Sequence, residues 1–207
     1  ANLRSWAASN EKSYVAHLAL GIYYKRRGTA ARGTRFIAQT PRADLERMGD
    51  YFGLAELELR MSLELSPKPF LSIYHLQTIA LARGDHAESR ALLDHANRVL
   101  PTNLLARARY ATTLTPRWGG SYEQLEAFAQ ETEAQHAPPA AATQIRAIAL
   151  DDLAKSLDCA GDVSAALEHA KRALELGVQA GGTFADEYLG DSRRIAQAGA
   201  APPSPCR

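Results

Sequence analysis

The amino-acid sequence predicts an all-α fold assembled from pairs of helices. Apolar residues recur with helical periodicity over almost the whole chain of 207 residues. Runs in which β-branched and aromatic residues alternate with polar ones, the signal for a strand, are almost absent. Residue pairs that end helices recur along the chain. In order, they are Thr40-Pro41, Ser66-Pro67, Gly84-Asp85, Pro101-Thr102, Gly119-Gly120-Ser121, Pro138-Pro139 and Gly161-Asp162.

These signals set the expected helix boundaries. Thr40 can cap a helix that has Pro41 at its first position, and Asp85 and Asp162 are natural N-caps after a glycine. Ser121 begins a capping box. The expected helices span 12–39 (with Gly28 as a point at which the helix can break), 41–65, 69–83, 85–99, 102–114, 121–136, 140–160, 162–177 and 183–197. Residues 200–207 are rich in proline and are expected to form a disordered tail.

Part of the pattern repeats at a fixed interval. Pro67 and Pro101 are 34 residues apart, and the same offset relates Leu59 to Leu93. A period of 34 residues is that of the tetratricopeptide repeat, a helix–turn–helix unit. In its pattern, positions 20, 24 and 32 hold a small residue, an apolar residue and a proline, and Ser89, Leu93 and Pro101 occupy them here.

A second copy lies nearer the C-terminal end. Apolar residues precede the turn at Gly161-Asp162, and small residues follow it at Ala166, Ala170 and Ala173. Small side chains at these positions let the two helices of a hairpin approach closely. The turns at Gly84, Gly120 and Gly161 are spaced less regularly, so the middle units carry insertions.

The predicted architecture is therefore a tetratricopeptide-like right-handed superhelix of helical hairpins with irregular middle repeats. A single α-solenoid domain is expected over residues 1–199. Its parts are a helix pair at 12–65, repeat-like units at 69–101, 102–137 and 140–178, and a capping helix at 183–197.

Composition excludes several classes of function. The formal net charge is +1, so no global field would recruit nucleic acid or a membrane. No stretch approaches the roughly 18–20 apolar residues of a membrane span. The chain begins at Ala1, so we expect a segment upstream, and a cytoplasmic protein, or a periplasmic one if a signal has been removed. Cys159 and Cys206 are expected to be free thiols, with a bridge between them as the alternative in an oxidising compartment.

The block from Arg109 to Tyr122, with its Arg-Trp-Gly-Gly-Ser element at 117–121, resembles the signature of an uncharacterised bacterial family that carries a domain of unknown function. Residues 18–24 and 31–33 resemble an earlier motif of that family. The resemblance implies a tetratricopeptide-like fold. Similar proteins occur near toxin–immunity or secretion genes, which implies an immunity or accessory role with a toxin or secretion component as the partner.

The loop around Arg117 and Trp118 admits two interpretations. In the structural one, Trp118 fills the gap between hairpins, Arg117 pairs with a carboxylate or caps carbonyls, and the glycines adopt positive φ. In the functional one, Arg117 and Trp118 form a hot spot for a partner, since these residue types dominate such sites.

A basic run on the first long helix also has two interpretations. No acidic residue occurs from Ser13 to Ala43, and the run contains Lys25, Arg26, Arg27, Arg32 and Arg35. Lys25 and Arg32 share one helix face. That face is either solvated and paired with a neighbouring helix, or an electrostatic patch for an acidic partner. On the same helix, His17, Gly21, Tyr24 and Gly28 form a stripe that is expected to admit a crossing helix.

The expected concave groove would be lined by the first helix of each repeat. In the unit 69–101 the lining residues are Leu71, Tyr74, Thr78 and Leu81, and in the unit that follows Pro139 they are Ile148, Asp151, Lys155 and Asp158. This mixture of apolar and charged side chains suits a folded partner or an apolar peptide.

Signals for catalysis are poor. The chain lacks the usual motifs for metal hydrolases, serine hydrolases, phosphate loops and dinucleotide binding, so no catalytic, cofactor or metal residues are assigned. Asp151-Asp152 is expected to be a solvated first turn, and Cys159 with His169 is a weak candidate dyad because acids flank the thiol.

The sequence thus favours a protein-binding scaffold that is not an enzyme, with contacts from Lys25, Arg32, Tyr74, Thr78, Arg117, Trp118, Asp151 and Lys155. Two alternatives stay open. One is an enzyme of unrecognised type with its site at the Arg117–Ser121 loop, which a deep pocket with perturbed titratable groups would favour. The other is a structural homo-oligomer.

Overall fold

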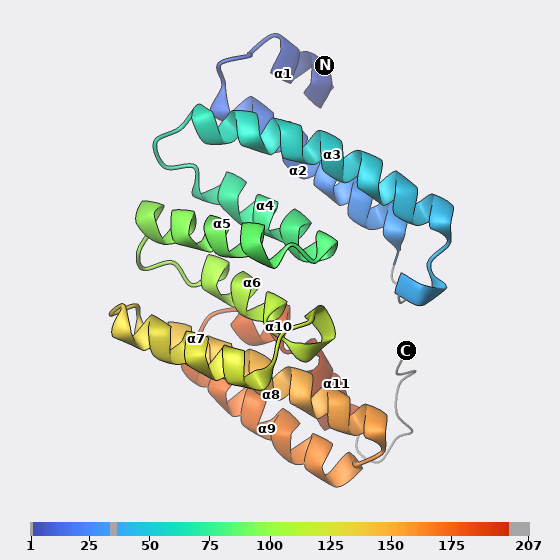
Figure 1. Cartoon of the computed structure of the whole chain (residues 1–207), viewed down its shortest axis with the longest axis vertical. Coiled ribbons are helices and arrows are strands. Elements are labelled where there is room, and N and C mark those ends of the chain that lie inside the picture. The colour runs from blue at the N-terminus through green and yellow to red at the C-terminus, as the bar shows by residue number, and fades with distance from the viewer. Residues whose placement is uncertain (1, 34–36, 199–207) are drawn as a thin grey trace. The chain divides into compact units, whose positions relative to one another are not determined.

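The structure, a computed structural model, describes residues 2–33 and 37–198. Within these ranges every regular element is helical and no strand is present, which confirms the predicted all-α class (Figure 1). The described chain forms two compact units that divide after Pro101, and each is treated separately below.

The N-terminal unit contains five α-helices and one 3-10 helix among its described residues. They are α1 (Leu3–Ala8), α2 (Tyr14–Arg32), η1 (Ile37–Gln39), α3 (Arg42–Glu64), α4 (Phe70–Arg83) and α5 (His86–Val99).

The C-terminal unit contains the remaining described helices. They are α6 (Leu105–Thr113), η2 (Pro116–Trp118), α7 (Tyr122–Ala134), α8 (Pro139–Ala160), α9 (Val163–Ala180), α10 (Phe184–Tyr188) and α11 (Gly190–Ala198).

Most helix starts follow the predicted caps. The side chains of Asp85, Ser121 and Asp162 accept hydrogen bonds from backbone N–H groups three residues on, and they begin α5, α7 and α9. The predicted cap at Thr40 is wrong, because α3 begins at Arg42 with Pro41 at the cap position and no side-chain cap.

Three further boundaries differ from the prediction. The helix expected at 12–39 ends at Arg32, where Gly33 adopts φ +69°, and it does not break at Gly28. The helix expected at 183–197 is divided at Leu189 into α10 and α11. The short helix α1 had no recognised signal in the sequence. The expected disordered tail at 200–207 lies outside the described residues.

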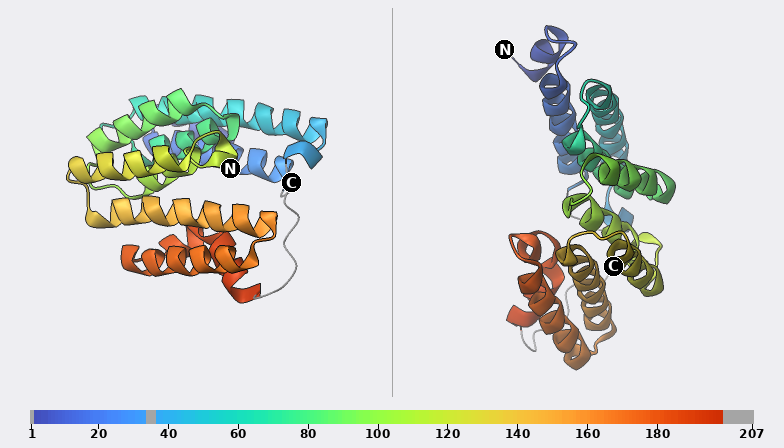
Figure 2. Two further views of the ribbon diagram at one scale, coloured as in Figure 1. Left: turned by 60° about the horizontal axis from the view of Figure 1, so that its bottom comes forward. Right: turned by 90° about the vertical axis from the view of Figure 1, so that its left-hand side faces the viewer.

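In the N-terminal unit, α2 and α3 pack as a close pair (Figures 1 and 2). The predicted stripe of His17, Gly21, Tyr24 and Gly28 is buried, which confirms it as a packing face. A Cβ at Gly28 would lie 2.5 Å from Phe52 Cδ1 on α3, so only glycine fits there without a shift. His17 adds a polar link, with Nδ1 2.7 Å from Glu58 Oε2.

In the C-terminal unit, α8 and α9 form a hairpin, and Gly161 makes the turn at φ +83° (Figure 2). The predicted small residues Ala166, Ala170 and Ala173 are completely buried, as close approach of the two helices requires. Ile195 of α11 packs on this hairpin beside Ala154. The helix α11 therefore covers one side of the α8–α9 pair.

None of the helices within the described ranges combines the length and apolarity needed to cross a membrane. The thiol of Cys159 in α8 is not free, so the expectation of free thiols is wrong for this residue. Cys206, the other cysteine of the sequence, lies outside the described residues.

Candidate functional site

The loop between α6 and α7 is a rigid turn that presents Arg117. Thr115 is fully buried, its hydroxyl donates to Thr112 O at 3.0 Å, and its carbonyl accepts from Trp118 N. Gly119 adopts φ +88°, and a Cβ at Gly120 would lie 2.1 Å from Leu114 O. The positive φ expected of these glycines is confirmed for Gly119 only, whereas Gly120 is required because the Leu114 backbone leaves no room for a Cβ.

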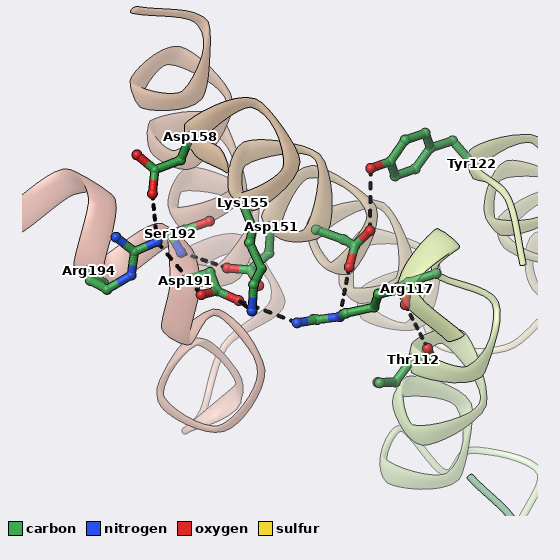
Figure 3. Close-up of polar contacts among 11 residues, drawn as sticks. Thr112, Arg117, Tyr122, Asp151, Lys155, Asp158, Asp191, Ser192 and Arg194 are labelled. Carbon is green, nitrogen blue, oxygen red and sulfur yellow. Dashed lines mark hydrogen bonds and ion pairs between the residues drawn. The ribbon is translucent and has the colours of Figure 1, made fainter. Parts of the chain in front are cut away.

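Arg117 reaches from this loop to two helices of the same unit (Figure 3). Its Nε lies 2.7 Å from Asp152 Oδ1 on α8, and its Nη1 lies 3.4 Å from Asp191 Oδ2 on α11. Asp152 also accepts a hydrogen bond of 3.3 Å from the hydroxyl of Tyr122, the first residue of α7. One guanidinium thus ties the loop to α8 and α11.

Three further contacts join α8 to α11. Lys155 Nζ lies 3.2 Å from Asp191 Oδ2. The backbone N–H of Ser192 donates to Asp151 Oδ1 at 2.7 Å, and Arg194 Nη2 lies 2.9 Å from Asp158 Oδ2. We call the set the aspartate network. Its members are Arg117, Tyr122, Asp151, Asp152, Lys155, Asp158, Asp191, Ser192 and Arg194.

Two carboxylates of α8, those of Asp151 and Asp152, are buried, and burial shifts their pKa. Asp151 is 2% exposed and Asp152 is 4% exposed. Burial raises the pKa of both above the ordinary aspartate value, although the Ser192 N–H and the Arg117 guanidinium act in the opposite direction. The pKa of Tyr122 is raised to about 12, first by burial and then by the charge of Asp152.

Asp151 and Asp152 lie in the middle of α8, so the expectation of a solvated first turn is wrong. The burial of Asp151 also removes its carboxylate from any surface that a partner reaches, which corrects its assignment as a contact residue. Arg117 and Lys155 hold internal ion pairs but keep about a third of their side chains exposed, at 37% and 30%. Trp118 is half-buried in the loop.

The aspartate network contains the residue types of an acid–base site, but its side chains are already engaged in hydrogen bonds and ion pairs with one another. Two raised carboxyl pKa values and a tyrosine converge there, which is the feature that favours catalysis. Each of these groups is nevertheless bonded to another side chain or to the backbone. An open groove of about 900 Å³ lies elsewhere, on α1 and α2. Within the described ranges, no group of three or more histidine, cysteine or acidic side chains is arranged to hold a metal ion.

The remaining predicted residues lie in the N-terminal unit. Tyr74 and Thr78 are half-buried on α4, and Leu71 beside them is 48% exposed. Lys25 of α2 lies next to them, with Nζ 3.1 Å from His75 Nδ1. We call Lys25, Leu71, Tyr74, His75 and Thr78 the α2–α4 face.

One residue assigned to this face lies differently from the prediction, and Arg32 of the basic run lies on the same helix as Lys25, as expected. Leu81, expected to line the groove, is only 8% exposed and belongs to the core. Arg32 lies at the end of α2, where Nη1 donates to Gly33 O at 3.4 Å.

Several members of the aspartate network carried no recognised sequence signal. Tyr122 belongs to the motif block, but nothing there indicated a carboxylate partner. Asp191 and Arg194 are three residues apart on α11, a spacing common on solvated helices. Arg117 and Asp191 are 74 residues apart in the chain, so their pairing depends on how α11 packs.

Comparison of the chain with protein-family models, with curated proteins and with solved structures finds no match. The resemblance carried by the Arg117–Ser121 motif therefore stays a prediction.

Proposed function

We propose that this chain is a protein–protein interaction scaffold, a tetratricopeptide-like superhelix of helical hairpins that binds a partner protein. The all-helical described chain and the hairpins at Gly84 and Gly161 are compatible with it. We also propose membership of the bacterial family that shares the Arg117–Ser121 motif, with an immunity or accessory role toward a toxin or secretion component.

The α2–α4 face is the observation that carries the proposal. Leu71, Tyr74 and Thr78 lie at i, i+3 and i+7 of α4, so they share one side of that helix. Leu71 exposes apolar surface that no described element covers, and Lys25 adds a cation at the margin. An apolar surface with a tyrosine and a charged rim is typical of a protein contact site.

The aspartate network supports the scaffold in another way. It fixes the loop 114–121, α8 and α11 to one another through ion pairs with buried carboxylates. These contacts restrain the Arg117 loop, so less conformational entropy is lost if the exposed part of Arg117 contacts a partner.

The test is affinity capture from the organism that encodes the chain, comparing wild type with Tyr74→Ala. We expect Tyr74→Ala to lose a captured protein that wild type retains. The matched control is Tyr14→Ala, which removes a tyrosine at the start of α2, away from this face. Both variants are first checked for helical content by circular dichroism. Equal capture by wild type and a folded Tyr74→Ala would contradict the role of the α2–α4 face.

The raised carboxyl pKa values near Arg117 favour one alternative, an enzyme with its site at the Arg117–Ser121 loop. In that case, the exposed fraction of Arg117 would contact substrate and Asp152 would exchange a proton. A screen of hydrolase substrates in which Asp152→Asn and Arg117→Ala abolish turnover while the protein stays folded would support this function over the scaffold.

A further inference from the structure

The arginines of α1 and α2 contrast with most of the other arginines of the described chain. No described carboxylate forms an ion pair with Arg4, Arg26, Arg27 or Arg32. Elsewhere, ion pairs with aspartate or glutamate engage Arg42, Arg47, Arg60, Arg83, Arg90, Arg117, Arg146, Arg172, Arg193 and Arg194. Arg27 donates one hydrogen bond to the Tyr51 hydroxyl and Arg32 donates one to Gly33 O, so the region around α1 and α2 has cations that no described carboxylate neutralises.

Two of these guanidinium groups are held in place by aromatic rings. Arg4 lies over the ring of Tyr24, and Arg27 lies over the ring of Tyr51, each at 5.4 Å from the ring centroid. Tyr24 and Tyr51 are themselves stacked, with centroids 6.5 Å apart. Cation–π contacts of this kind restrain the guanidinium and leave its N–H edges available. Less side-chain entropy is then lost when an anion binds.

An open groove lies beside these arginines. It has a volume of about 900 Å³, and its lining includes Arg4, Trp6 and Tyr23. Trp6 is 37% exposed and Tyr23 is 41% exposed, so two large rings face solvent there. Arg26 and Arg27 follow Tyr23 by three and four residues on α2, which places them one turn along the same helix.

We propose that this surface, formed by Arg4, Trp6, Tyr23, Arg26 and Arg27, binds an acidic peptide segment that carries apolar side chains. The carboxylates of the peptide pair with the guanidinium groups, and an apolar side chain enters the groove between Trp6 and Tyr23. The assignment rests on charge complementarity, because no acidic residue occurs from Ser13 to Ala43, the stretch that holds Arg26 and Arg27, and no described carboxylate pairs with Arg4. The proposal rests on the proposed function, because it takes a segment of a protein as the ligand. The surface is distinct from the α2–α4 face.

Peptide is favoured over nucleic acid by the arrangement of the rings. Single-stranded nucleic acid is bound by a row of aromatic side chains that stack on successive bases along a basic channel. Here the two exposed rings line a single groove, and the net charge of the chain is only +1.

The experiment measures fluorescence anisotropy of a labelled synthetic peptide of alternating glutamate and phenylalanine. We expect wild type to bind it with an affinity that weakens as salt is added. The double variant Arg4→Ala, Arg27→Ala should weaken binding by about tenfold or more, since it removes two charge-assisted contacts. Trp6→Ala should weaken it while leaving the salt dependence unchanged.

The matched control is the double variant Arg42→Ala, Arg172→Ala. It changes the net charge by the same amount, and both of its arginines are exposed and lie outside this surface. Binding by this control should equal that of wild type. Equal weakening by both double variants would overturn the proposal, because long-range charge alone would then explain the binding.

Two other results would also overturn it. One is the absence of binding to the acidic peptide at low salt. The other is tighter binding of a thymidine oligonucleotide, weakened by Arg4→Ala, Arg27→Ala, which would assign the surface to nucleic acid. Neither result bears on the α2–α4 face, which is tested separately by Tyr74→Ala. Conversely, if Tyr74→Ala captured every protein that wild type captures, the conclusion drawn from the peptide measurement would not change.

Discussion

At the scale of single residues, Asp152 is the buried carboxylate of the aspartate network that joins the Arg117 loop to α7. Its carboxylate is 4% exposed and contacts both Arg117 and Tyr122. A buried charge of this kind is stable only while its partners are in place, since removing one partner leaves an uncompensated group. Two predictions about protonation follow from this position.

The first concerns the hydroxyl of Tyr122, whose pKa is raised to about 12. Since burial is the largest cause and Asp152 the second, Asp152→Asn should lower this pKa without returning it to about 10. NMR titration of tyrosine ring carbons, with Tyr122→Phe to assign the signal, measures it. In wild type, stability should fall as pH rises from about 10 toward the folded-state value, because the unfolded tyrosine ionises first. A Tyr122 signal that titrates at the ordinary value would contradict the burial.

The second concerns Asp152 itself. Because its folded-state pKa lies above the ordinary value, the folded protein binds the carboxyl proton more tightly than the unfolded chain does. The free energy of unfolding of wild type relative to Asp152→Asn should therefore rise as pH falls through the folded-state pKa toward about 4. Urea unfolding at a series of pH values measures the difference.

Glu133 supplies a control of opposite sign. Arg146 lowers its pKa, so the stability lost in Glu133→Gln should be present at neutral pH and disappear as pH falls through the lowered pKa. If the stability difference between wild type and Asp152→Asn changed with pH in the same direction as the difference for Glu133→Gln, the ion pair with Arg117 would outweigh burial in setting the pKa of Asp152.

At the scale of helices, α2 and α3 are held at close range by glycine. Gly21 faces Leu59 and Gly28 faces Phe52, in both cases with less than 3.0 Å available to a Cβ. On the exposed side of α3, Gly49 and Gly53 have no atom within 4 Å of a Cβ position. The same residue type therefore has two different environments in one helix pair.

This contrast gives a prediction with a built-in control. Gly28→Ala should destabilise the protein by about 1–3 kcal/mol, because overpacking outweighs the gain in helix propensity. Gly53→Ala should stabilise it by up to about 1 kcal/mol, since only the propensity changes. Thermal or urea unfolding followed by circular dichroism compares the two. A stabilising Gly28→Ala would mean that Phe52 moves aside without loss.

The start of α11 depends on a side chain from another helix. Asp151 accepts the N–H of Ser192, which is otherwise an unsatisfied donor of the first helical turn. Asp151→Ala should cost about 2 kcal/mol and speed hydrogen exchange in α11 more than in α9. Glu175→Ala, which removes only the exposed pair with Arg172, is the control. Unchanged exchange in α11 would show that Ile195 and the other ion pairs hold this helix without Asp151.

At the scale of the whole molecule, each compact unit has its own buried apolar residues. Leu59 and Ile145 are completely buried, the first in the N-terminal unit and the second in the C-terminal unit. Each core is built from helices adjacent in the chain, α2 with α3 and α8 with α9. Local order within a unit therefore depends mainly on contacts made inside it.

Substitution of one core residue in each unit tests this organisation. Leu59→Ala and Ile145→Ala should each lower stability by about 2–5 kcal/mol. By hydrogen exchange with mass spectrometry, Leu59→Ala should loosen residues up to Pro101 more than those from Thr102 onward, and Ile145→Ala should do the reverse. Equal loosening of both units by either variant would show that they unfold as one.

Much of the fold was predictable because its signals are local. Asp85, Ser121 and Asp162 cap the helices they were expected to cap, and Ala166, Ala170 and Ala173 pack where the repeat pattern required small side chains. The error at Thr40 and the missed helix α1 are also local. Adjacent residues that could each begin a helix differ little in free energy, so the sequence does not decide between Thr40 and Pro41 as the cap. The helix α1 has only six residues, which is too short to show helical periodicity.

The sequence by itself determined the all-α class, most helix boundaries and the stripe of small residues on α2 that admits a crossing helix, since each depends on residues within a few turns. Only the tertiary structure showed that Asp151 and Asp152 are buried, because the helical pattern is the same for a buried and a solvated pair. It also joined Arg117 to Asp191 across 74 residues. Burial and ion pairing are set by the helix that packs alongside, and no local signal in the chain specifies which helix that is.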